Sequence, residues 1–264
     1  MDILKQRRIS QITSLLALHS SWGPQMKWLC NPVLSCHSCV LSYFACPIGV
    51  LVHFSGYHLF PFLALGMLLL VGALVGRLFC GWVCPFGFLQ DMLHKIKSPK
   101  FDLPKWTNNI KYLILLFMVF LIPYFLGEET LYSFCRICPA ATIQVGLPTY
   151  MFGDFTFKTG TFVRLGILAI VLIFAVTSLR SFCKTICPIG ALMALTNYMS
   201  LWAVKIPENS CVSCKKCDKS CPMDIEPAKR FSEDIPANRH PDCIVCHQCK
   251  DGCAVNTYQD VNEI

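Results

Sequence analysis

The sequence predicts a mainly α-helical membrane protein, with four transmembrane helices arranged as two parallel two-helix repeats and a small C-terminal α+β domain. The first observation is composition: of 264 residues, 54% are hydrophobic and 15% are charged, against about 25% charged in ordinary soluble domains. The second is a set of long apolar runs. The third is eighteen cysteines at repeated spacings, in a chain too apolar for a secreted disulfide scaffold. These features favour metal-binding thiols in a membrane protein.

Three apolar runs approach the ~20 residues that a helix needs to cross ~30 Å of hydrocarbon. They are Leu59 to Val75, which continues to Phe79, then Tyr112 to Leu126, and Phe162 to Phe182. Buried helices of a soluble protein are the alternative, but three runs of this length with so few charges disfavour it. Arg77, Arg164 and Arg180 lie near the ends of the runs, where long side chains can reach the membrane interface.

A fourth and weaker run extends from Ile9 to Leu29 and is interrupted by polar residues and by Pro24. Because Lys5, Arg7 and Arg8 precede it, a signal peptide is the alternative to a helix that stays in the protein. No convincing small-residue cleavage site follows the apolar stretch. We therefore expect an uncleaved first transmembrane helix.

Basic residues indicate the orientation of these helices. They gather before the first helix and in the loop of residues 95–111, whereas residues 31–57 contain no Lys or Arg. By the positive-inside rule, this asymmetry predicts a multi-pass protein of the cytoplasmic membrane with both termini in the cytoplasm. The expected organisation is a transmembrane domain at residues 1–205 and a cytoplasmic domain at residues 206–264.

The C-terminal domain carries two runs of the spacing C-x2-C-x2-C-x3-C, separated by 21 residues. In two-cluster ferredoxins, three cysteines of such a run bind one [4Fe-4S] cluster and the fourth binds the other cluster. Cluster one is therefore predicted to use Cys211, Cys214, Cys217 and Cys253, and cluster two Cys243, Cys246, Cys249 and Cys221. Zinc is the alternative, but zinc ribbons pair two C-x2-C units and do not need the third cysteine. The pattern predicts a ferredoxin-like domain.

A second pattern places cysteine pairs at the ends of the predicted membrane helices. The inner pairs, Cys80 with Cys84 and Cys183 with Cys187, are both C-x3-C-P and lie 103 residues apart. The outer pairs, Cys36 with Cys39 and Cys135 with Cys138, lie 99 residues apart. The chain therefore resembles two copies of one unit, at about residues 9–97 and 110–200, that run the same way through the bilayer.

Two thiols from each copy, meeting near a two-fold axis, provide the four ligands of one [4Fe-4S] cluster on each side of the membrane. The inner cluster is predicted to use Cys80, Cys84, Cys183 and Cys187, and the outer one Cys36, Cys39, Cys135 and Cys138. Disulfides are the alternative for the outer pairs, because that compartment is oxidising. Cys46 also precedes a proline and is a substitute for Cys36 or Cys39, whereas Cys30 has no counterpart. The predicted total is four clusters.

The segments FCGWVCPFGFLQD and FCKTICPIGALMA, together with the C-terminal runs, resemble the NapH/NosR-type membrane polyferredoxins, also described as 4Fe-4S-binding quinol dehydrogenase membrane components. The resemblance spans nearly the whole chain. It implies a helical membrane subunit that exchanges electrons with quinones and with a partner oxidoreductase. The outer cysteines depart from the plain two-motif pattern, and an outer cluster would let electrons leave on the far side.

We therefore expect an electron-transfer subunit that connects the quinone pool or an outer redox partner with a partner oxidoreductase through [4Fe-4S] clusters. The alternative is an accessory iron-sulfur protein that assembles or regulates another metalloenzyme. His53 and His58 lie between the outer cysteines and the second helix, where imidazole can bind a quinone head. The net charge of +7 does not indicate nucleic acid, because Lys and Arg gather beside the apolar runs and in the C-terminal domain.

Overall fold

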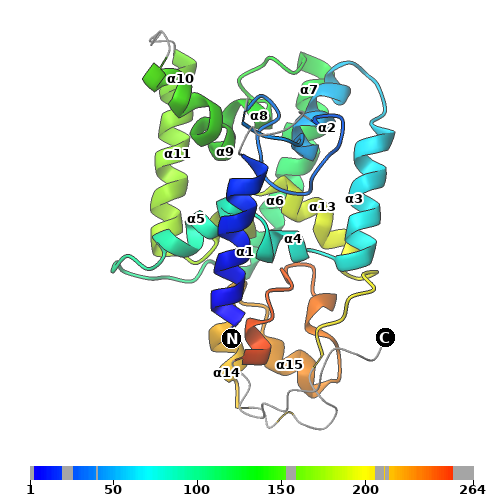
Figure 1. Ribbon diagram of the computed structural model, residues 1–264, viewed down its shortest axis with the longest axis vertical. Helices are drawn as coiled ribbons and strands as arrows, with labels where there is room; N and C mark the ends of the chain where they lie inside the picture. Colours follow the sequence, from blue (N-terminus) through cyan, green and yellow to red (C-terminus); the bar gives the residue numbers. More distant parts are fainter. Residues whose placement is uncertain are drawn as a thin grey trace.

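The computed structural model describes residues 3–19, 26–39, 41–152, 159–205, 211 and 214–251. Helices dominate this part of the chain, and its one β contact is an isolated bridge between Cys30 and Ala45 (Figure 1). The prediction of a mainly α-helical protein is therefore confirmed. The described residues of the C-terminal domain form helices and loops but no strand, so its predicted α+β character is not confirmed.

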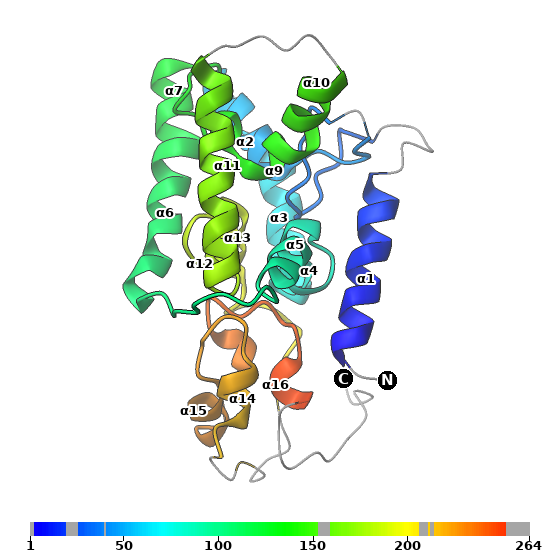
Figure 2. The same ribbon diagram turned by 90° about the vertical axis from the view of Figure 1, so that its left-hand side faces the viewer.

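Four long helical segments run alternately up and down the long axis (Figure 1, Figure 2). They are α1 (Ile3–Leu18), α3 (Phe62–Val75), the continuous segment of α6 (Ile110–Ile114), η2 (Leu115–Leu121) and α7 (Ile122–Leu126), and α11 (Thr159–Thr177). Two stretches are long and apolar enough to cross a membrane: Lys105–Leu126 and Gly160–Thr177, with mean hydropathies of 2.0 and 2.2. Phe125 and Ile173 are among the large apolar side chains exposed on them, as on a surface that faces lipid.

The first helix differs from the predicted span of Ile9 to Leu29. α1 begins at Ile3 and ends at Leu18, and residues 26–29 form a turn. Its buried side is polar, because Arg7 pairs with Asp91 and Gln11 donates a hydrogen bond to the carbonyl of Gly81 at 3.0 Å. These partners inside the protein offset part of the cost of burying the two polar side chains. Apolar runs alone therefore misplaced both ends of this helix.

Each half continues from its descending helix into two short helices. α3 leads to α4 (Leu78–Trp82) and α5 (Pro85–Leu93), and α11 leads to α12 (Ser181–Thr185) and α13 (Pro188–Thr196). In the first half the amide of Cys84 donates to the carbonyl of Phe79 at 2.9 Å. In the second half Cys187 and Phe182 make the same bond at 3.0 Å. The two halves therefore share this local structure after their descending helices.

The short helices interlock the two halves. α5 packs on α11 of the second half, and α13 packs on α3 of the first half. At Gly72 of α3, a Cβ would overlap the side chain of Thr196. A buried core that includes Phe86 and Phe182, whose ring centroids are 4.9 Å apart, extends across both halves. The two halves are therefore one packed unit.

Smaller elements form the two ends of the molecule. We call the end that carries the C-terminal domain the inner end; it contains η1 (Lys105–Asn109), α14 (Lys216–Ser220), α15 (Pro227–Ser232), η4 (Ala237–Arg239) and α16 (Gln248–Asp251). The outer end contains α2 (Pro47–Gly56), α8 (Phe134–Ile137), α9 (Pro139–Ala141), η3 (Thr142–Gly146) and α10 (Leu147–Phe152). The start of α1 reaches the C-terminal domain, where the amide of Ile3 donates to the carboxylate of Asp251 at 3.2 Å.

Candidate metal centres

Four cysteines share one local structure. Cys46, Cys84, Cys138 and Cys187 each occupy the N-cap of a helix whose first residue is proline. Proline suits this position because the first turn of a helix has no backbone bond for it to break. The backbone amide three residues later faces each sulfur and favours the thiolate; these amides belong to Gly49, Gly87, Ala141 and Gly190. The sequence repeat had grouped only three of these cysteines.

Burial opposes the thiolate at these positions. It raises the pKa of Cys46 and of Cys84 to about 12, and that of Cys138 to about 11. A thiol with such a pKa stays protonated at neutral pH unless a cation compensates the charge of the thiolate. Bound iron supplies that compensation in an iron-sulfur site. The buried thiols and their amide donors therefore fit a metal centre.

The structure brings the four predicted inner ligands together where α4, α5, α12 and α13 meet. Cys80 and Cys183 lie close to both Cys84 and Cys187. After burial, the negative charges of these two neighbours are the largest causes that raise the pKa of Cys84 and of Cys187. Gln90 supports this group: its Nε2 donates to Sγ of Cys183 at 3.2 Å, and its Oε1 accepts the amide of Phe182 at 3.1 Å. The sequence patterns did not point to Gln90. We call these four cysteines the inner tetrad.

The predicted ligands of cluster two also converge. Cys221, Cys243, Cys246 and Cys249 line one small internal cavity in the C-terminal domain. For cluster one, Cys217 is buried, Cys214 is exposed, and the thiol of Cys211 lies 4.0 Å from the carbonyl oxygen of Ala228. Cys253, its fourth predicted ligand, lies outside the described residues. The cluster-one set therefore stays a prediction.

The ligand loop of cluster two contacts the inner tetrad. Cys80 packs against the buried group that contains Cys243, Ile244 and Cys246. A Cβ at Gly81 would overlap the carbonyl oxygen of Ile244, so the two backbones approach without an intervening side chain. Beside them, Nε1 of Trp82 donates to the carbonyl of Val245 at 3.0 Å. Glycine is required here because the backbones are in contact.

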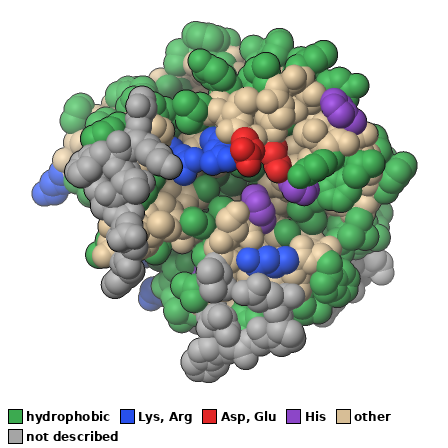
Figure 3. All heavy atoms as spheres, turned by 90° about the horizontal axis from the view of Figure 1, so that it is seen from above, with side chains coloured by type: hydrophobic (Ala, Val, Ile, Leu, Met, Phe, Trp, Pro, Cys, Tyr) green, Lys and Arg blue, Asp and Glu red, His purple; other side chains and the backbone are tan. Residues whose placement is uncertain are grey.

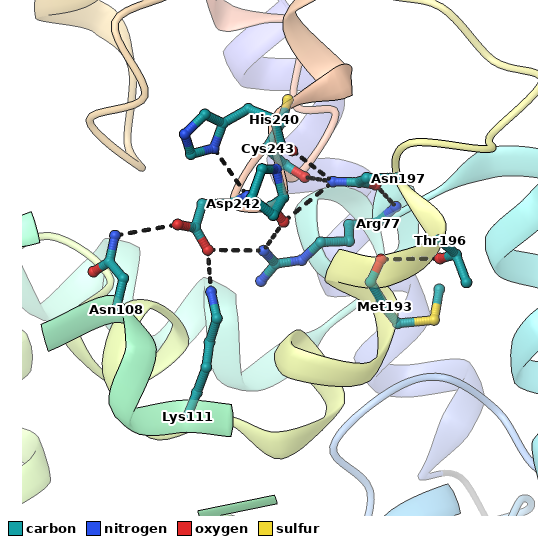
Figure 4. Close-up of polar contacts among 10 residues, drawn as sticks. Arg77, Asn108, Lys111, Met193, Thr196, Asn197, His240, Asp242 and Cys243 are labelled. Carbon is teal, nitrogen blue, oxygen red and sulfur yellow. Dashed lines mark hydrogen bonds and ion pairs between the residues drawn. The ribbon is translucent and has the colours of Figure 1, made fainter. Parts of the chain in front are cut away.

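A buried polar network holds the same loop against the membrane domain (Figure 4). Nδ2 of Asn197 donates to the carbonyls of His240, Pro241 and Cys243 at 3.0, 3.3 and 2.8 Å. Its Oδ1 accepts the amide of Arg77 at 2.9 Å. The guanidinium of Arg77 also donates to the carbonyl of Pro241 at 2.7 Å. Asn197 therefore ties the start of α4 to the cysteine loop.

The expected placement of two arginines at the membrane interface is wrong. The side chain of Arg77 is 1% exposed and that of Arg180 is 0% exposed. Arg77 lies 3.5 Å from Asp242, which also pairs with Lys111, and Arg180 pairs with Asp91 at 2.7 Å. Carboxylates inside the protein hold these side chains, and an analysis of apolar runs does not detect such partners.

At the outer end, a cavity of about 570 Å³ contains four cysteines, namely Cys36, Cys46, Cys135 and Cys138. Figure 3 shows a hollow in this face, with histidine, acidic and basic side chains around it. Cys39 is absent from the described wall, and its thiol instead donates to the carbonyl of Gln144 at 3.7 Å. The structure therefore groups Cys46, and not Cys39, with the other outer cysteines.

Gln144 orders the loop that leads to these cysteines. Its Oε1 accepts the amide of Cys36 at 2.6 Å, and its Nε2 donates to the carbonyl of Leu34 at 3.3 Å. The Cys-Pro step that Cys46 and Cys138 share is the sequence signal that favours this grouping. The equal spacing of the outer pairs pointed to Cys39 instead, because the loop before Cys46 in the first half is longer than the loop before Cys138 in the second half.

The two histidines predicted near a quinone are separated. His53 lines the outer cavity, with its Nδ1 2.5 Å from a carboxylate oxygen of Glu128. His58 packs instead on Tyr124, with ring centroids 4.3 Å apart, and is not part of the described wall. Cys30 is buried beside Ala45, away from the cavity wall. Of these residues, His53 alone contributes to the described wall.

The alternatives of zinc and disulfides gain no support in the described part of the chain. Its cysteines are all free thiols. No three His, Cys, Asp or Glu side chains in it are arranged to hold one metal ion. A zinc site gathers its ligands around one ion, whereas each thiolate of a [4Fe-4S] cluster binds a different iron.

Fold and sites together define a helical membrane protein made of two cysteine-bearing halves and a cysteine-rich inner domain. A family model described as "4Fe-4S binding domain" matches it twice, at residues 57–104 and 159–207. Each match contains one descending helix and one C-x3-C-P motif. No solved structure gave a significant match.

Three relatives illustrate the similarity. "Uncharacterized protein MJ0750" of Methanocaldococcus jannaschii is 30% identical over 68% of this chain and 70% of its own length. "Putative electron transport protein YccM" of Escherichia coli is 26% identical over 75% of this chain and 54% of its own. "Ferredoxin-type protein NapH" of Escherichia coli is 28% identical over 70% and 62%. The chain belongs to the NapH/NosR-type ferredoxin family.

Proposed function

We propose that the chain is an electron-transfer subunit of a membrane redox complex, which passes electrons between the quinone pool or an outer redox partner and a partner oxidoreductase at the inner end. The observation that carries this proposal is the contact of Cys80 and Gly81 with the loop of residues 243–246. [4Fe-4S] clusters bound by the cysteine sets would supply the one-electron carriers. The printed names of the relatives, "electron transport" and "ferredoxin-type", agree with this role.

We further propose that α1, α3, the segment of residues 105–126 and α11 are four transmembrane segments, with the inner end in the cytoplasm. The alternation of these helices supports this topology, as does the contact between Ile3 and Asp251, which places the start of α1 beside the C-terminal domain. Lysines of residues 95–111 lie at the same end, as the positive-inside rule requires of a cytoplasmic loop.

For the outer cluster we propose Cys36, Cys46, Cys135 and Cys138 as ligands. Cys46 and Cys138 have the same N-cap structure, and all four thiols face one cavity. Cys46→Ser should therefore lower the iron content by about four per chain. Cys39→Ser is the matched control and should leave the iron content unchanged. Iron analysis of both anaerobically purified variants makes the test, and loss of iron from the Cys39 variant alone would reverse the assignment.

His53 and Glu128 provide a proton-accepting pair at the cavity wall, where quinol oxidation needs two protons removed from the quinol oxygens. We place the quinone at this end of the chain, with His53 in contact with its head.

Reduction by quinol tests the function as a whole. The protein is reconstituted in sealed vesicles with its outer end exposed, a water-soluble short-chain quinol is added, and the clusters of the C-terminal domain are followed by EPR at low temperature. We expect these clusters to become reduced under anaerobic conditions. Clusters that assemble fully and react with dithionite, but never with quinol or with an outer donor such as a reduced dye, would contradict the proposal.

A further inference from the structure

Two buried arginines occupy equivalent positions on either side of the inner tetrad. Arg77 and Arg180 each precede the first cysteine of a C-x3-C-P motif by three residues, and they are 103 residues apart, as the cysteines are. Both guanidinium groups are shielded from solvent. Burying a charge is costly unless nearby groups compensate it. Because Arg77 and Arg180 occupy the same position in both halves, beside the cysteine motifs, they indicate a role at these cysteines.

Each arginine crosses to the opposite half. Nη1 of Arg180 donates to the carbonyl of Cys80 at 3.1 Å, and its Nη2 lies 3.3 Å from the position of a Cβ on Gly87. Nη2 of Arg77 lies 2.8 Å from the position of a Cβ on Gly190. Glycine at these two positions leaves room for a guanidinium group beside the thiol-bearing loop. Both cations therefore lie against the backbone that carries the four thiols.

Each arginine also belongs to a group of two cations around one carboxylate. Arg180 shares Asp91 with Arg7, and Arg77 shares Asp242 with Lys111. Burial acts to raise the pKa of Asp91, but Arg180 and Arg7 outweigh it and hold that pKa below its ordinary value. The carboxylate of Asp91 is therefore ionised, and the group of Arg180, Arg7 and Asp91 keeps one excess positive charge. Simple ion pairs would leave none.

We propose that Arg77 and Arg180 are positioning residues that raise the reduction potential of a cluster bound by the inner tetrad. Four thiolates make a bound cluster anionic, and reduction adds one more negative charge. Nearby fixed cations stabilise the reduced state more than the oxidised state. The electron comes from the quinol or outer donor and leaves to the cluster-two set, with no bond made or broken at the arginines. This inference rests on the proposed inner cluster.

Two variants of one group test the inference, because they change its charge in opposite directions. Arg180→Gln removes a cation. We expect the equilibrium constant for reduction of the inner cluster to fall about tenfold, which lowers its reduction potential by about 59 mV for one electron. Asp91→Asn removes an anion and should raise the potential by a similar amount. Anaerobic EPR titration of the whole protein gives both values, and iron analysis reports assembly. A general loss of packing would not produce shifts of opposite sign.

Arg7→Gln is the second variant for the case in which Arg180→Gln does not assemble, since Arg7 lies in the same group without a bond to Cys80. Arg164→Gln, at the outer cavity, is the control and should leave the inner potential unchanged. The inference would be overturned if the potential of the inner cluster did not change, or if Arg7→Gln and Asp91→Asn shifted it in the same direction. The proposed inner cluster would not be affected by either result. Absence of an inner-cluster signal from the unmodified protein would instead overturn the proposed cluster together with the inference.

Discussion

Replacing Cys80 with serine will remove about four irons per chain and stop the reduction of the C-terminal clusters by quinol. Cys80 belongs to the inner tetrad and also packs against the cysteine loop of residues 243–246, so it lies at the junction of the two domains. Serine has nearly the same volume but is a poor ligand for iron in these clusters. The ligands of clusters one and two lie downstream in the chain, so those clusters should still assemble and react with dithionite.

Cys30→Ser is the control for this experiment, since Cys30 is buried but lies outside the proposed sets. Its iron content and its reduction by quinol should match those of the unmodified protein. Quinol-linked reduction of the C-terminal clusters that continues at the normal rate in Cys80→Ser would show that electrons do not pass through the inner tetrad.

Gly81→Val will separate the C-terminal domain from the inner tetrad. A side chain at this position meets the carbonyl oxygen of Ile244, which is backbone and cannot rotate away. Overpacking of this kind typically costs about 1–3 kcal/mol, which weakens docking of the domain by about 5- to 150-fold. Electron transfer into the C-terminal clusters should slow by a comparable factor while the iron content is unchanged. Rapid-freeze EPR after mixing with quinol measures the rate.

Gly66→Val provides the matched substitution, because a Cβ at Gly66 meets nothing within 4 Å. It adds the same side chain to the same domain without touching the cysteine loop, and its transfer rate should be normal. Equal rates in the two variants would mean that the contact at Gly81 is not the route into the C-terminal domain.

The helix N-cap positions of Cys84 and Cys187 could be predicted because their cause is local. Proline after Cys84 and Cys187 ends one helix and begins the next, and this fixes the thiol at an N-cap whatever surrounds it. The cores of α3, of the segment 105–126 and of α11 follow equally from local hydrophobicity. Local causes of this kind are visible in a single sequence.

The features that the sequence did not reveal depend on contacts between distant residues. α1 extends toward the N-terminus because Arg7 meets Asp91, 84 residues away. Arg77 and Arg180 enter the protein because Asp242 and Asp91 receive them. At the outer end, equal spacing paired Cys39 with Cys138, whereas the fold aligns the Cys-Pro steps and tolerates the longer loop before Cys46. Such partners lie too far apart in the chain to be found from the spacing of residues.

We propose that four cysteine sets of this chain bind four [4Fe-4S] clusters in series. Iron and acid-labile sulfide, measured against protein concentration after anaerobic purification of the full chain, test it most directly. Two membrane sets and two C-terminal sets predict about sixteen irons and an equal amount of sulfide per chain. About eight irons, with the EPR signals of only the C-terminal clusters, would contradict the claim and leave the membrane cysteines without a metal.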